Sequence, residues 1–95
     1  MDNRKLEDLR SDLDTIREDL DRLLAMAEAA GVGRRRRFGR YLETLDRKQA
    51  DMHVALERVD DGRADIDIDE IEAGVRETWA RLAIAKRAAE ARFAP

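Results

Sequence analysis

The stretch LEDLRSDLDTIREDLDRLLAMAEAA, residues 6–30, decides the fold class of this chain. Its apolar residues recur alternately three and four positions apart, which is the spacing of a coiled-coil seam, the row of side chains that faces neighbouring helices. The seam residues are Leu6, Leu9, Leu13, Ile16, Leu20, Leu23, Ala27 and Ala30. We therefore expect a helix over residues 3–30, capped by Asp2 or Asn3 and ended by Gly31 in a left-handed conformation.

Two further segments carry the same spacing. The second seam comprises Phe38, Leu42, Leu45, Gln49, Met52, Leu56 and Val59, and it predicts a helix over residues 36–60 that Asp60, Asp61 and Gly62 close. Gln49 is its one polar member, and a buried amide on a seam favours one register at some cost in stability.

The third seam drifts from a strict heptad. Its members are Ile68, Ile71, Val75, Trp79, Leu82, Ala85 or Lys86, Ala89 and Phe93, and they predict a helix over residues 67–93. Asp65 or Asp67 would cap its start, and the acids that follow complement the helix dipole. We expect Trp79 to be substantially buried between the other two helices.

Three long helices joined by short turns predict an all-α fold, an antiparallel three-helix coiled-coil bundle that occupies residues 1–95 as a single domain. The alternative is a long helical hairpin that dimerises, because a heptad pattern does not show whether its partner is the same chain. In the bundle, Leu23 would face Leu42, with Arg10 near Asp60 and Asp19 beside Lys48.

The composition supports this prediction and excludes several chemistries. Charged residues make up 43% of the 95 residues and aromatic residues only 4%, which is typical of long helices rather than of a mixed fold. The chain has no cysteine, which excludes disulfides, thiol catalysis and the usual zinc sites. The polar start and the lack of a long apolar run favour a cytoplasmic bacterial protein.

Charge is distributed unevenly along the chain. Residues 1–33 hold nine acids and five bases, for a net charge of −4. Residues 34–59 hold eight bases and four acids, for +4, and residues 60–95 hold nine acids and six bases, for −3. A basic middle segment between two acidic ones suggests that the middle helix packs against both neighbours.

The stretch IDEIEAGVRETW, residues 68–79, resembles part of the C-terminal helix of small bacterial coiled-coil proteins of unknown function, some of them described as apolipoprotein-like or stress-related. The matching residues are Gly74, Val75, Trp79, Leu82, Ala89 and Phe93, while Ile68 stands where those proteins have an aromatic residue. The segment YLETLDRKQADMHVALERV, residues 41–59, is similar to their middle helix, so the resemblance covers residues 38–93. It implies a helical bundle and brings no catalytic residue.

The arginine cluster in GVGRRRRFGRY, residues 31–41, is the one candidate for binding anions or lipid. The candidate contacts are Arg34, Arg35, Arg36, Arg37 and Arg40. The run from Arg34 to Arg37 contains no aromatic residue and the chain is acidic overall, so nucleic acid is disfavoured as a partner. The preferred interpretation is a charged turn whose arginines are exposed and contribute little to stability, because glycines flank it at 31, 33 and 39.

No residue pattern indicates catalysis, a cofactor or a metal site. The acidic run DDGRADIDIDE, residues 60–70, fails the EF-hand spacing when it is counted from Asp60 or from Asp65. His53 is the only histidine and Ser11 the only serine, so neither has the partners of a catalytic group. The sequence therefore predicts a non-enzymatic structural or protein-interaction module, with a homodimer as one option. The alternative is a membrane-surface or anion-binding protein that uses the arginine cluster.

Overall fold

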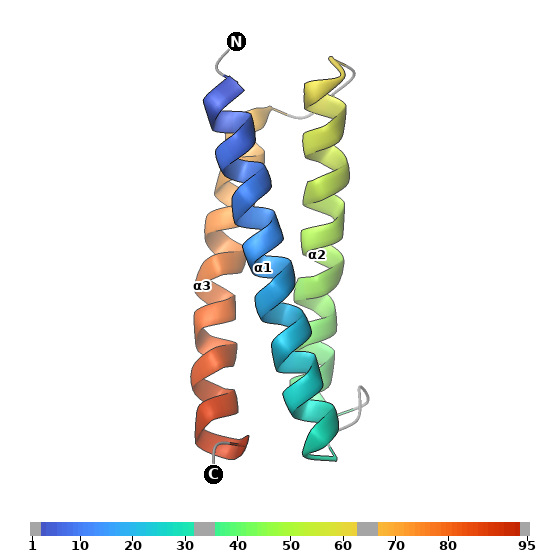
Figure 1. Ribbon diagram of the computed structural model, residues 1–95, viewed down its shortest axis with the longest axis vertical. Coiled ribbons are helices and arrows are strands. Elements are labelled where there is room, and N and C mark those ends of the chain that lie inside the picture. The colour runs from blue at the N-terminus through green and yellow to red at the C-terminus, as the bar shows by residue number, and fades with distance from the viewer. Residues whose placement is uncertain (1–2, 32–35, 63–66, 94–95) are drawn as a thin grey trace.

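The computed structural model describes residues 3–31, 36–62 and 67–93, and its helices pack mutually into a compact all-α bundle. The helices are α1 (Asn3–Ala29), α2 (Arg37–Asp60) and α3 (Ile68–Phe93). They run alternately down, up and down the long axis of the molecule, so α1 and α3 are parallel and the two chain ends lie at opposite ends (Figure 1). The extents of 47 × 21 × 16 Å match helices of about 40 Å lying side by side.

Each of the three helices packs against the other two within one chain. This agrees with the predicted bundle and not with the alternative of a long hairpin that dimerises. The bounds differ from the predicted ones by a residue at the end of α1 and at the starts of α2 and α3. Gly31 and Gly62 end the first two helices with positive φ angles of 76° and 72°, a conformation in which a Cβ atom is unfavourable. At the start of α3, the carboxylate of Asp67 accepts a hydrogen bond from the backbone N–H of Asp69, at 3.3 Å, which confirms Asp67 as the cap.

The first two seams are buried as predicted. On α1 every seam residue from Leu6 to Ala27 is buried, whereas Ala30 follows the helix and is exposed. On α2 all seven seam residues are buried, including Gln49. Gly74 on α3 allows α2 and α3 to approach closely. A Cβ atom at this position would lie 2.9 Å from the sulfur of Met52 on α2.

The third seam differs from its prediction at one position. Thr78 is fully buried, whereas Trp79 is 39% exposed, so the prediction that Trp79 is substantially buried was wrong. The buried residues of α3 are Ile71, Val75, Thr78, Leu82, Ala85 and Ala89, which follow a strict heptad without drift. Thr78 is tolerated there because its hydroxyl donates a hydrogen bond of 2.8 Å to the backbone oxygen of Gly74 in its own helix. Ala85 rather than Lys86 occupies the next seam position, and the side chain of Phe93 lies outside the described part.

Ion pairs lie along all three contacts between helices. Between α1 and α2, Arg10 pairs with Asp60 at 3.1 Å, as the register predicts, and Arg17 pairs with Asp46 at 2.6 Å. The predicted pair of Asp19 and Lys48 was wrong, because both side chains turn towards α3. Asp19 binds Lys86 at 2.6 Å, and Lys48 binds Glu77 at 3.1 Å.

The prediction for Asp19 and Lys48 assumed that α2 presents positive charge to α1. The positive charge of the middle segment instead lies mostly on exposed arginines, away from its contact with α1. Arg36, Arg37, Arg40 and Arg47 are exposed, while α2 offers α1 the acids Asp46, Glu57 and Asp60. Segment charge therefore gave the wrong polarity for the α1–α2 contact, where α1 supplies the bases.

The pair between Glu77 and Lys48 makes stability depend on pH. The hydrogen bond and the charge of Lys48, together with Arg81, lower the pKa of Glu77 below its ordinary value. Because the pKa is lower in the folded chain, this contribution is present above the unfolded pKa, about 4.3, and is lost as pH falls through the folded pKa.

We therefore expect Glu77→Gln to lower the melting temperature at pH 7 and to have a smaller effect at pH 2. Thermal unfolding followed by circular dichroism at both values measures the difference. Glu18→Gln on the exposed face of α1, for which no interhelical pair is found among the described residues, is the matched control. An equal loss at both pH values for Glu77→Gln would contradict the assignment.

Candidate functional site

The clearest candidate surface is the outer face of α3, because the exposed apolar residues concentrate on this helix. Among the described residues, α1 and α2 each expose two apolar side chains within the helix, whereas α3 exposes six. The six are Ala73, Trp79, Ala80, Ala83, Ile84 and Ala91. Of the large apolar side chains that the structure describes, Ile84 is the most exposed, at 63%, and it lies on the side of α3 opposite the buried seam.

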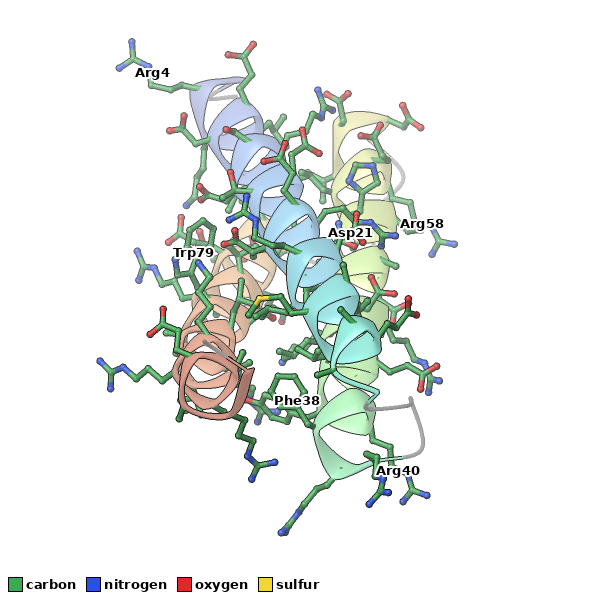
Figure 2. All side chains as sticks on the ribbon, turned by 60° about the horizontal axis from the view of Figure 1, so that its bottom comes forward. Arg4, Asp21, Phe38, Arg40, Arg58 and Trp79 are labelled. Atoms are coloured by element: carbon green, nitrogen blue, oxygen red, sulfur yellow. The ribbon has the colours of Figure 1, made fainter. Side chains whose placement is uncertain are left out.

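A shallow groove adjoins this face where the start of α2 meets the second half of α3. Its volume is 230 Å³, and its lining consists of Arg37, Phe38, Tyr41, Ile84, Ala85, Ala88 and Arg92. Tyr41 fixes one wall, since its hydroxyl donates a 3.1 Å hydrogen bond to the backbone oxygen of Arg81 on α3. Phe38 lies between the two helices, whereas Arg40 projects away from them (Figure 2). The groove thus has an apolar floor between two arginines.

The arginine turn is only partly within the described residues. Arg34 and Arg35 lie outside them, while Arg36, Arg37 and Arg40 are exposed. Of the described members of the cluster, Arg37 lines the groove, together with Arg92 near the end of the chain. Charge is also divided along the long axis, because α3 ends with Arg87 and Arg92 beside the start of α2, while the acids of its first turn lie at the other end.

Each of the four replacements of Arg34 to Arg37 by glutamine should shift the melting temperature by less than about 4 °C, because a single surface substitution usually changes stability by under about 0.5 kcal/mol. The described members of this cluster, Arg36 and Arg37, are exposed. Differential scanning calorimetry of the fourfold variant measures the change. A loss of the cooperative transition would show instead that the cluster holds the α1–α2 turn together.

The remaining candidates for chemistry stay isolated in the structure. His53 is half-buried at the α1–α2 contact, where Asp14, Arg17 and Gln49 line the same hollow, and its Nδ1 atom has no hydrogen-bond partner among the described residues. Within residues 3–31, 36–62 and 67–93, no three His, Asp or Glu side chains gather closely enough to hold a metal ion. Nor does any helix in these ranges have the length and apolarity needed to cross a membrane.

The outer face of α3 is the surface that the sequence analysis missed. A signal was present in the sequence. Residues 73, 77, 80, 84, 87 and 91 repeat the alternating spacing of four and three on the side opposite the seam. Alanine is only weakly hydrophobic and is common on exposed helix faces because it favours helix formation. The second row therefore cannot be told from an ordinary exposed helix face until the burial of the first row is known.

Fold and surface together define the class of this chain: an all-α bundle of three helices in alternating directions that exposes apolar side chains on the outer face of α3. No protein-family model, curated protein or solved structure matches the chain. The resemblance of residues 38–93 to small bacterial coiled-coil proteins therefore stays a prediction.

Proposed function

We propose that this chain is a non-enzymatic, cytoplasmic protein-interaction module that presents the outer face of α3 to another helix. The observation that carries the proposal is the concentration of exposed apolar side chains on one helix of three, with Ile84 63% exposed. Scattered apolar residues on a protein surface are ordinary, whereas a row of them along one helix is typical of a surface that binds another helix. The groove beside Ile84 extends this surface towards α2.

A photo-crosslinking amino acid placed at position 80 tests the proposal inside the cells that produce the protein. Ala80 is exposed on the outer face of α3, and Glu18, exposed on α1, provides the matched control position. We expect a defined protein adduct from position 80, identified by mass spectrometry, that is lost when Ile84→Asp is added. Equal labelling from positions 18 and 80, or no adduct from position 80, would reject the α3 face as an interaction surface.

A second candidate function is binding to an anionic surface, and the arginines around the groove support it. Arg37 and Arg92 flank an apolar floor, and Arg36 and Arg40 are exposed at the same end. Basic side chains beside exposed apolar groups are the combination by which a peripheral protein binds anionic lipid.

Co-sedimentation with vesicles that contain phosphatidylserine tests this second function. Binding would fall steeply with added salt and with Arg36→Gln, Arg37→Gln and Arg40→Gln combined. Vesicles of phosphatidylcholine alone are the control. Binding that is equal for both kinds of vesicle, or that resists salt, would rule out an electrostatic role for these arginines.

A further inference from the structure

The outer face of α3 is a second heptad row, opposite the buried one. Ala73, Glu77, Ala80, Ile84, Arg87 and Ala91 lie alternately four and three positions apart, and all six are exposed. Two rows on opposite sides of one helix allow α3 to contact its own bundle with one side and a second helix with the other. Neither α1 nor α2 has such a row in its described residues, because their outward positions are predominantly charged or polar.

The charge of α3 changes sign halfway along the helix. Residues 68–80 hold four acids and one base, for a net charge of −3. Residues 81–93 hold four bases and one acid, for +3. A helix with this polarity is complementary to a copy of itself in the antiparallel direction and is repelled by one in the parallel direction.

We propose that the partner on this face is a second copy of the chain, whose α3 packs antiparallel to the first about a two-fold axis at the level of Leu82. This proposal rests on the proposed function and names its partner. Every pair of row residues is then symmetric about position 82. Ala73 meets the partner's Ala91, Glu77 meets the partner's Arg87, and Ala80 meets the partner's Ile84.

The pairing suits the side chains that make it. Small alanines let two helices approach to the short end of the usual 8–10 Å interaxial range, and each Ile84 leaves water to lie over an alanine of the other copy. The contact is isologous, so it closes at two chains and does not propagate into a fibre. The two symmetry-related pairs of Glu77 with the partner's Arg87 lie within this outer row, where they select the antiparallel register.

Both charged partners have the capacity for this contact. Arg87 is exposed and forms no ion pair with the described residues. Glu77 already binds Lys48 at 3.1 Å and Arg81 at 2.9 Å, but its side chain is 50% exposed and a carboxylate accepts about four hydrogen bonds. A third cation therefore adds to the existing pairs without displacing them.

An anionic membrane fits this face less well than a second copy does. A flat anionic surface that contacted the whole row would face the acidic half of α3 as well as the basic half. Two copies bring each half against its opposite.

Sedimentation equilibrium on the purified protein tests the stoichiometry and the charge pairs. We expect a monomer–dimer equilibrium for the wild type and a monomer for Ile84→Asp. Glu77→Arg and Arg87→Glu should each weaken the dimer by about tenfold or more, because the symmetry places every change in two contacts. Combining both changes should restore dimerisation, since the pair is then reversed but intact. Circular dichroism of each variant separates loss of the dimer from loss of the fold.

Cysteine crosslinking tests the register. Because the chain has no natural cysteine, only the introduced cysteines can form a disulfide. An equimolar mixture of Ala80→Cys and Ile84→Cys chains should form a disulfide-linked dimer faster than a mixture of Ala73→Cys and Ile84→Cys. A wild-type protein that stays monomeric at millimolar concentration, equal crosslinking in both mixtures, or no rescue by the reversed pair would overturn the proposal. If position 80 meanwhile labels a different protein in cells, the proposed function stands and only the identity of the partner is wrong.

Discussion

Thr78→Asp should unfold the protein or remove most of its stability. Thr78 is fully buried on the α3 seam, and its only polar contact among the described residues is the hydrogen bond to its own helix. A carboxylate there would be a buried charge without a partner, which costs about 3–5 kcal/mol. A 95-residue domain has a total stability of roughly 5–14 kcal/mol, so the expected loss is a large share of it.

Urea denaturation followed by circular dichroism measures this loss, with Ala83→Asp, an exposed position on the same helix, as the control. Thr78→Val should keep the fold, because the lost hydroxyl leaves no unpaired donor and the shape is conserved. The comparison with Trp79→Asp decides whether the α3 seam passes through Thr78 or through Trp79. If Trp79→Asp were the more damaging change, the seam would pass through Trp79 as the sequence alone suggests, and the assignment of Thr78 would be wrong.

Leu13→Ala is expected to lower the melting temperature by roughly 10–30 °C. Leu13 is fully buried in the middle of α1, and truncating such a leucine costs about 2–5 kcal/mol because transfer energy is lost and a cavity remains. For a domain of this size, each 1 kcal/mol shifts the melting temperature by about 4–8 °C. Leu13 is one of the largest fully buried side chains among the described residues, so its truncation removes an appreciable part of the core.

Val54→Ala gives the matched control, because Val54 is 52% exposed and its truncation should stay within about 0.5 kcal/mol. Thermal unfolding of both variants at one protein concentration keeps any self-association constant. Similar losses for the two variants would mean that α2 buries Val54 in solution, for instance against another chain. A loss below about 1 kcal/mol for Leu13→Ala would mean that the α1 seam does not form the centre of the core.

The sequence by itself determined the three helices, their ends and two of the three seams. These features are local, since a heptad of leucines, a glycine with positive φ and an acidic cap each act within a few residues of chain. Leu6 to Leu23 and Phe38 to Val59 are buried as predicted, because large apolar residues at helical spacing have no other way to leave water.

Only the tertiary structure decided which residues of α3 are buried and which charged side chains form ion pairs. Thr78 and Trp79 are neighbours in sequence, and hydrophobicity favours the tryptophan for the core. The packing of α3 against α1 and α2 instead buries the threonine, whose hydroxyl is satisfied inside its own helix. Likewise, the partners of Asp19 and Lys48 depend on which helix each side chain turns towards, and net segment charge carries no such information. The outer row of α3 becomes visible only when the inner row is known to be covered, because exposure is a property of the assembled helices and not of any one of them.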